Sequence, residues 1–275
     1  MTTATETGTG AGWQHPPVIP VISAAAWVLL AGPAAVSGLP ELCSSALLWS
    51  VPAPETYAFF LSQVSALSLL LAWLLMLVAM MLPVLSDTLA HVRRSAFRPL
   101  RLPMQTACLT GYLVVWMLAG IALLTGSVTL RLGAGQDTTL PVLIGLALAL
   151  LWQLSPAKQR ALNRCHLYPP LSAFAPQAHR DAFRLGLDRG LWCLRSCWAL
   201  MLLALLVPGG HLAAMAAVAV WIWAERLDLP APPRWGLHLP GRALRLVRRR
   251  IAGAIAAASP PPRRPNPPPP AARKA

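Results

Sequence analysis

Six apolar stretches separated by short polar segments dominate the hydrophobic pattern of the chain. An α-helix needs roughly 17 to 25 apolar residues to cross a bilayer, and each stretch is close to that length. The expected spans are residues 18–37, 62–86, 107–130, 138–155, 191–208 and 210–227, of which the fourth and sixth are the shortest. The pattern predicts an all-α fold, a polytopic transmembrane helical bundle of about six spans.

The basic residues lie almost entirely in three segments, because 22 of the 23 follow the second, fourth or sixth stretch and only Arg131 does not. Cytoplasmic loops are rich in Lys and Arg, so we expect these segments and both termini in the cytoplasm. The loop after the first stretch carries Glu41 and Glu55 but no base, as expected of an external loop. The sequence therefore predicts a multi-pass protein of a bacterial inner (cell) membrane.

The amino-acid composition and the absence of known motifs argue against several classes of protein. With 56% hydrophobic and 12% charged residues, a chain of 275 residues is too apolar to be a soluble domain. The net charge of +14 comes from basic residues in the segments that are predicted to be cytoplasmic. The sequence contains no nucleic-acid-binding motif. Common hydrolase, zinc-protease and nucleotide-binding motifs are absent from the sequence. We therefore expect neither a nucleic-acid partner nor an enzymatic activity.

The two ends of the chain differ from the membrane domain predicted for residues 18–228. Residues 1–17 and the proline-rich tail 259–275 are expected to be disordered. In the basic juxtamembrane segment 229–258, apolar residues recur at helical spacing opposite a cluster of arginines. They are Leu244, Val247, Ile251 and Ile255. This pattern is typical of an amphipathic helix on anionic lipid headgroups, but also of a solvated basic tail.

Sulfur-bearing residues recur every fourth position in the fifth stretch. Cys193, Cys197 and Met201 would form one stripe on a helix. Two thiols and a thioether on one face indicate either a soft-metal site or ordinary core packing.

Further candidate ligands are expected at the same, cytoplasmic, depth of the membrane. They are Met76, Met80 and Met81 in the second stretch, Cys108 beside Tyr112 in the third, and Cys165 with His166 before the fifth. Copper(I) favours thiolate and thioether ligands. The competing interpretation is that the methionines fill gaps in the core and that His166 is solvated at the interface.

Glu225 is a carboxylate at the inner end of the apolar sixth stretch, next to Arg226. A charge in this position usually has a partner or a role. The simplest expectation is an ion pair with that arginine.

The order and spacing of several short motifs resemble those of a bacterial family of predicted metal-binding integral membrane proteins, domain of unknown function 2182, often labelled copper chaperones. The resemblance covers roughly residues 65–228. The matching segments are Trp73-x-x-Met76, Ala79-Met80-Met81-Leu82-Pro83, Gly111-Tyr112, Trp116, Gln153-Leu154-Ser155-Pro156-Ala157-Lys158, Cys165, Gly186-Leu187-Asp188-Arg189-Gly190-Leu191-Trp192-Cys193, Cys197-Trp198-Ala199-Leu200-Met201 and Glu225. The resemblance implies a copper site supported by Tyr112, Lys158, His166, Trp198 and Glu225.

Two family cysteines are replaced in this chain, by Ala161 and Ser196. A serine hydroxyl is a poor substitute for a thiolate toward a soft metal. Arg195 is further expected to place a positive charge beside the site, which opposes cation binding. The remaining thiols, Cys165, Cys193 and Cys197, still allow a three-sulfur site with Met80 or Met81 nearby.

These observations lead to one preferred function and two alternatives. The preferred one is an integral membrane protein that binds a soft metal, with copper(I) as the expected ion, or hands it to a metal-accepting protein. The first alternative is a structural or accessory membrane subunit whose metal site has decayed. A small-solute permease ranks last, because the outer half of the predicted spans holds few polar residues.

Overall fold

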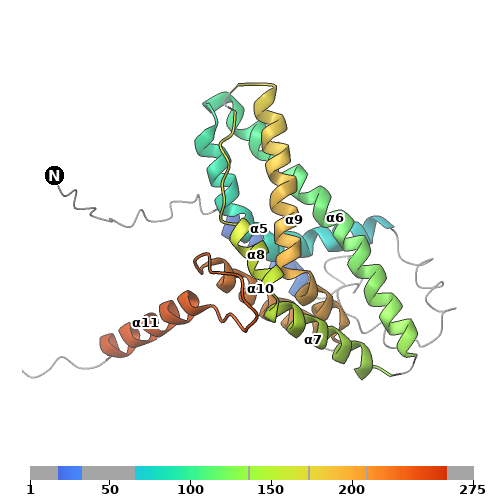
Figure 1. The fold of residues 1–275 in the computed structure, drawn as a ribbon. Coiled ribbons are helices and arrows are strands. Elements are labelled where there is room, and N and C mark those ends of the chain that lie inside the picture. Colours follow the sequence, from blue (N-terminus) through green and yellow to red (C-terminus); the bar gives the residue numbers. More distant parts are fainter. Residues whose placement is uncertain (1–17, 33–65, 136, 173, 209, 259–275) are drawn as a thin grey trace, which may run out of the picture.

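The computed structural model describes residues 18–32, 66–135, 137–172, 174–208 and 210–258. Throughout these ranges the regular secondary structure is helical (Figure 1). The helices are α1 (Val18–Ala31), α5 (Ala66–Ser95), the short 3-10 helix η1 (Arg98–Leu100), α6 (Arg101–Ala134), α7 (Thr139–Leu154), α8 (Pro156–Arg164), α9 (Gln177–Leu206), α10 (His211–Arg226) and α11 (Gly241–Ala258). The all-α prediction is confirmed. The predicted disordered ends and the acidic external loop lie outside the described residues.

Each predicted apolar stretch contains a helix, but not every helix is long enough to cross a bilayer. Three are long and apolar enough, at Leu69–Ser95, Arg98–Ala134 and Gln177–Leu206. A fourth span results if α7 and α8, which meet at an angle of 66°, are counted as one broken span. α1 has 14 residues and α10 has 16, which is shorter than the roughly 20 residues of an average span. The structure therefore supports a helical membrane protein with three to four candidate spans.

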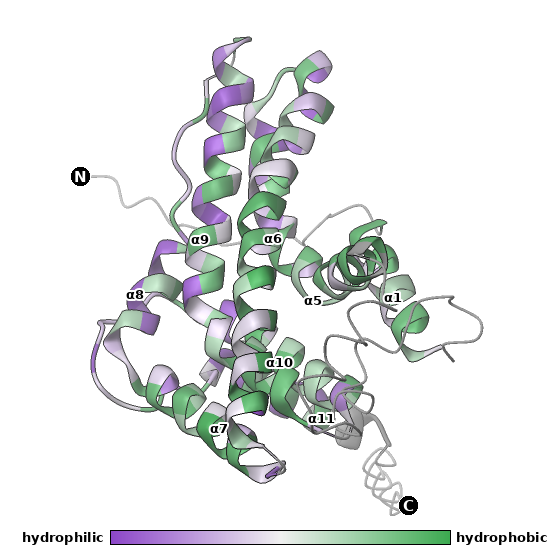
Figure 2. Ribbon diagram, turned by 90° about the vertical axis from the view of Figure 1, so that its right-hand side faces the viewer, coloured by the Kyte–Doolittle hydropathy of each residue, from purple (hydrophilic) through white to green (hydrophobic). Residues whose placement is uncertain are grey.

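Helices α5, α6 and α9 extend beyond the predicted apolar stretches and form a polar head. α5 continues to Ser95, 9 residues beyond the predicted limit of 86, and α9 begins at Gln177, 14 residues before the predicted limit of 191. A 30-residue helix is about 45 Å long, so roughly 15 Å lies beyond a 30 Å hydrocarbon core. Figure 2 shows hydrophilic residues concentrated at the free end of α9. A separate hydrophobic cluster, which includes Val92, Met104 and Leu185, fills the head.

Glycines allow α6 and α9 to pack with their backbones in contact. A Cβ added at Gly186 would lie 2.0 Å from the carbonyl oxygen of Cys108, and one at Gly111 would lie 2.3 Å from that of Phe183. Gly190, one turn after Gly186, faces the side chain of Val115, whose Cβ would lie 2.8 Å from an added Cβ. Close backbone approach through small residues is a common mode of helix association in membranes. This contact fixes the helix that carries the candidate thiols.

Pro83 in the middle of α5 organises the packing of α1 and α10. A proline has no N–H, so the carbonyl four residues earlier, that of Ala79, loses its helical partner. Ser23 Oγ and Trp27 Nε1 from α1 donate to this oxygen at 2.7 and 3.1 Å. The carbonyl of the next residue, Met80, accepts a 2.8 Å hydrogen bond from Trp223 Nε1 of α10. The proline thus frees the Ala79 carbonyl as an acceptor inside the apolar layer, where an unpaired carbonyl is costly.

Candidate metal centre

The thiols of Cys193 and Cys197 lie buried on consecutive turns of α9, with 2% and 1% of each residue exposed. Tyr112 Oη on α6 donates a hydrogen bond to Cys193 Sγ at 3.3 Å. The Cys193 carbonyl oxygen accepts hydrogen bonds from Ser196 Oγ at 2.7 Å and from Cys197 Sγ at 3.1 Å. The predicted stripe is therefore turned inward, against α6.

Arg226, at the end of α10, brings its guanidinium to the thiols. Nη2 of Arg226 donates a 3.2 Å hydrogen bond to Ser196 Oγ. The same group contacts the Cys165 thiol and acts electrostatically on Cys193 and Cys197. The expectation that Arg195 supplies this charge is wrong, because that side chain is exposed and its Cζ lies 5.1 Å from the ring centroid of Trp192.

Cys165 directly follows α8 and approaches the cluster from the end of that helix. Nη1 of Arg189 on α9 holds this position by donating to the carbonyl oxygens of Arg164 and Cys165, at 3.0 and 2.6 Å. Burial raises the pKa of the Cys165 thiol above its usual range, while the guanidinium of Arg226 acts in the opposite direction. The thiol is thus held near Arg226 by the backbone around it.

The methionines predicted as ligands pack in the same core as Cys193 and Cys197. Met76, Met80, Met81 and Met201, each at most 2% exposed, belong to this cluster together with Tyr112. Trp198 is half-buried at its edge and packs against Trp152, with ring centroids 5.3 Å apart. Cys108 belongs instead to the cluster that fills the head. The structure therefore brings most of the predicted sulfur atoms into one region but leaves Cys108 apart.

The donor set fits a soft ion, although a three-thiol site is not formed. Among the residues that the structure describes, no group of three His, Cys, Asp or Glu side chains is arranged to hold one ion. Two neighbouring thiols with thioethers in the surrounding core remain, and such ligands favour copper(I) over harder ions.

Glu225 pairs with Lys158 and not with Arg226, contrary to the sequence-based expectation. The side chains of both partners are only 5% exposed. The same carboxylate oxygen, Oε1, accepts hydrogen bonds from Gln153 Nε2 at 3.2 Å and Trp221 Nε1 at 2.7 Å. Lys158 also donates to Gln153 Oε1. This buried network ties the bend between α7 and α8 to the end of α10.

The bend itself is set by local sequence. Ser155 Oγ accepts a 3.0 Å hydrogen bond from the backbone N–H of Ala157, and Pro156 occupies the first turn of α8. A serine cap followed by proline is a typical start of a helix. The motif Gln153-Leu154-Ser155-Pro156-Ala157-Lys158 therefore has a structural explanation that needs no metal.

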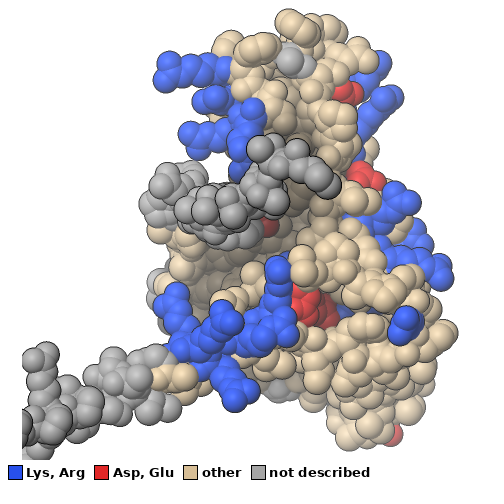
Figure 3. All heavy atoms as spheres, turned by 60° about the vertical axis from the view of Figure 1, so that its left-hand side comes forward, with Lys and Arg blue, Asp and Glu red and all other residues tan. Residues whose placement is uncertain are grey.

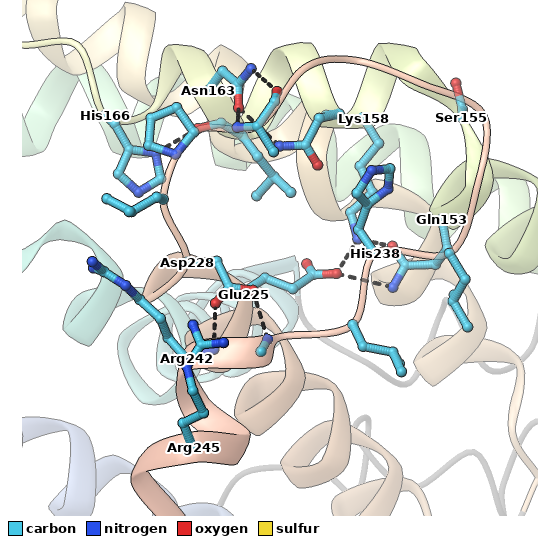
Figure 4. Close-up of a pocket in the computed structure, with 18 residues that line it drawn as sticks. Gln153, Ser155, Lys158, Asn163, His166, Glu225, Asp228, His238, Arg242 and Arg245 are labelled. Atoms are coloured by element: carbon cyan, nitrogen blue, oxygen red, sulfur yellow. Dashed lines mark hydrogen bonds and ion pairs between the residues drawn. The ribbon is translucent and has the colours of Figure 1, made fainter.

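A cavity of about 490 Å³ borders the network of Lys158, Gln153 and Glu225 (Figure 4). It is enclosed by α8, the ends of α7 and α10, the start of α11 and the connecting segment 227–240, here called the strap. His166 lines the cavity, and its ring nitrogens face the carbonyl oxygens of Leu162 and Arg226 at 3.0 and 3.4 Å. The structure thus places His166 at the cavity wall, engaged with backbone.

Two groups that the sequence did not single out shape the site. Arg226 appeared only as a partner for Glu225, and nothing local to the sequence shows that its guanidinium reaches α9. Gly186 and Gly190, in contrast, carry a readable signal, because two glycines four residues apart on one helix face allow a close helix contact.

The chain was compared with known proteins. A family model described as PpoB2, copper chaperone, matches residues 70–244. No curated protein and no solved structure matches the chain. The matched region includes the thiols, Arg226 and the network around Glu225, and it spans well over half of the 275 residues. The chain therefore belongs to the PpoB2 copper chaperone family.

Proposed function

We propose that this protein carries copper(I) as cargo on the thiols of Cys193 and Cys197 and passes it to an acceptor protein, without acting as an enzyme. The observation that carries the proposal is the pair of buried thiols on consecutive turns of α9, in one core with four methionines. Membership of a copper chaperone family supports the choice of metal.

Arg226 is proposed to balance the charge of the loaded site. Copper(I) bound by two thiolates carries a net charge of −1, and an uncompensated charge in a low-dielectric interior is unfavourable. The guanidinium of Arg226 already lies in electrostatic contact with both thiols. A fixed cation therefore favours the loaded state of a two-thiolate site, although it would oppose binding of an ion by neutral ligands.

Cys165 is proposed as the exchange ligand on the route to the acceptor. Its thiol contacts Arg226, which also acts electrostatically on the other two thiols, but it belongs to the segment whose next residue, His166, lines the cavity. A thiol in this position can take copper from Cys193 or Cys197 by ligand exchange. Met80, Met81, Met76 and Met201 are neutral, weaker ligands that would hold the ion transiently.

The topology that we propose for this function has six crossings with both termini cytoplasmic, in a bacterial inner membrane. Figure 3 shows Lys and Arg side chains gathered over the upper part of the molecule and near α11, whereas the lower end is largely uncharged. α11 exposes Leu244, Val247 and Ile251, which suits a helix lying on anionic headgroups. The short helices α1 and α10 would cross with local thinning of the bilayer.

A structural or accessory subunit is the second candidate, favoured by the contact between Arg226 and Ser196. In that case the guanidinium and the hydroxyl together would substitute for a lost metal ligand, and the thiols would be packing residues.

Copper content separates the two candidates. The full-length protein, purified from cells grown with added copper, is compared with Cys193→Ser/Cys197→Ser and with Cys108→Ser as a matched control. The proposal predicts close to one copper per chain in wild type and in the control, and almost none in the double variant. Negligible copper in all three would leave the accessory role.

A further inference from the structure

The cavity behind the strap is lined by groups of both charges, and two of the basic ones, Arg242 and Arg245, differ from the rest in how they are engaged. Its cationic lining residues are Lys158, Arg242 and Arg245, and its acidic ones are Glu225 and Asp228. Its volume of about 490 Å³ is within the range of small-molecule sites in proteins. The kind of ligand that the cavity can bind depends on which hydrogen-bond donors and acceptors on its wall already have partners in the protein.

Both carboxylates already accept hydrogen bonds from protein donors. Glu225 accepts from Lys158, Gln153 and Trp221. Asp228 accepts from the backbone N–H groups of Gly241 at 3.0 Å and Arg242 at 2.7 Å, and so caps the start of α11. Both acids are therefore engaged by the protein, and the first N–H groups of α11 are already used.

Arg242 and Arg245 differ from the two acids in their hydrogen bonding. Within the described part of the chain, the guanidinium groups of Arg242 and Arg245 make no ion pair or hydrogen bond. Arg245 folds back along its helix, because its Nη1 lies 3.6 Å from the position that a Cβ on Gly241 would take. Arg242 and Arg245 are one turn apart, so both guanidinium groups lie on one side of α11. His238 on the strap adds an imidazole to the same cavity.

The strap is fixed at several points, so the cavity is formed before any ligand arrives. Asn163 on α8 donates to the Ala231 carbonyl at 2.7 Å and accepts from its N–H at 3.1 Å. The N–H of Gly236 donates to the Leu154 carbonyl at 3.1 Å. Figure 4 shows the Asn163 contacts on one side of the cavity and the network of Lys158, Gln153 and Glu225 on another. A preformed site avoids the cost of ordering a loop on binding.

We propose that this cavity binds a phosphate group, held by the guanidinium groups of Arg242 and Arg245 with His238. Arginine matches the geometry of phosphate oxygens with paired N–H donors, and such charge-assisted hydrogen bonds are stronger than neutral ones. The source is free phosphate or the headgroup of an anionic lipid. This inference is independent of copper binding, because it uses none of the thiols.

The test uses the full-length protein in maltoside detergent and isothermal titration calorimetry at fixed ionic strength. One arm titrates sodium phosphate, and the other titrates short-chain phosphatidylglycerol. The variant is Arg242→Gln/Arg245→Gln. The matched control is Arg248→Gln/Arg250→Gln, which removes the same charge from exposed positions of α11 that do not line the cavity. Far-UV circular dichroism and thermal unfolding of each variant show whether it is folded.

Binding in either arm that weakens at least about tenfold in the first variant but not in the control supports the site. The arm that shows this behaviour identifies the source as free phosphate or lipid. Absence of binding in both arms, or an equal loss in the control, overturns the proposal. If the first variant is unfolded, Arg242→Lys/Arg245→Lys keeps the charge but loses the paired donors, and unchanged affinity in that variant also contradicts the proposal.

Discussion

Nη2 of Arg226 donates a 3.2 Å hydrogen bond to Oγ of Ser196, which holds a cation from the end of α10 against the thiol-bearing face of α9. Ser196 stands where the family resemblance led us to expect a cysteine. A hydroxyl in that position is a good acceptor for a guanidinium and a poor ligand for copper(I). The contact therefore suits a site with fewer thiolates, in which a protein cation replaces part of the charge balance.

Arg226→Gln is expected to weaken copper(I) binding by about tenfold or more. The substitution leaves an anionic two-thiolate complex without its counter-charge in a buried site. Retention of copper is measured against a soluble copper(I) chelator. Arg195→Gln is the control, since Arg195 is exposed and lies against Trp192, and its retention should equal that of wild type. Stronger retention in Arg226→Gln would mean that the arginine competes with the metal.

Gly186→Ala should destabilise the protein by roughly 1–3 kcal/mol or prevent its folding, because α6 and α9 must move apart. The added Cβ would lie 2.0 Å from the Cys108 carbonyl oxygen. Gly126→Ala on α6 is the matched control, since a Cβ there meets nothing within 4 Å. The control should be neutral or slightly stabilising. Thermal unfolding in detergent measures both, and equal midpoints would show that the helices do not touch here.

Lys158→Met is expected to cost roughly 3–5 kcal/mol, because it leaves the buried carboxylate of Glu225 without its cation. The double variant Lys158→Met/Glu225→Met should recover much of this loss, since it removes both charges. Arg160→Met, on the exposed face of α8, should change stability by less than about 0.5 kcal/mol. A double-mutant cycle from chemical unfolding measures the coupling. Additive effects of the two single substitutions would show that the ion pair is not formed.

Ser23→Ala/Trp27→Phe should destabilise the packing of α1 by about 1–3 kcal/mol, because the Ala79 carbonyl is left unpaired. Adding Pro83→Ala to the double variant supplies an N–H to that carbonyl and should restore part of the loss. Thermal unfolding of the double and triple variants tests the arrangement. If the triple variant is no more stable than the double one, the proline does not free the acceptor that α1 uses.

The helices themselves could be predicted from the sequence because apolar periodicity and length decide them. Their ends could not, since α5 and α9 continue into polar residues that are stabilised by packing in the head and not by lipid. Val92, Met104 and Leu185 show this, because they form a cluster of their own beyond the predicted stretches. Packing in the head also separates Cys108 from Cys193 and Cys197, although Cys108 and Tyr112 lie four residues apart on α6.

The candidate site was predictable where its residues share one helix. Cys193, Cys197 and Met201 lie on one buried face because helical geometry fixes their spacing. Contacts between different helices could not be predicted, because no local sequence pattern indicates them. Arg226 reaches Ser196 across 30 residues, and Lys158 reaches Glu225 across 67, so only the folded chain shows which charges meet.

The central claim is that copper(I) is bound by the sulfur atoms of Cys193 and Cys197, and X-ray absorption at the copper edge of the loaded protein tests it most directly. The account predicts a reduced, copper(I) edge with sulfur as the only kind of nearest neighbour. It also predicts that Cys193→Ser/Cys197→Ser loses this signal while Cys108→Ser keeps it. Nitrogen or oxygen neighbours in the wild-type protein, or an unchanged spectrum in the double variant, would contradict the account.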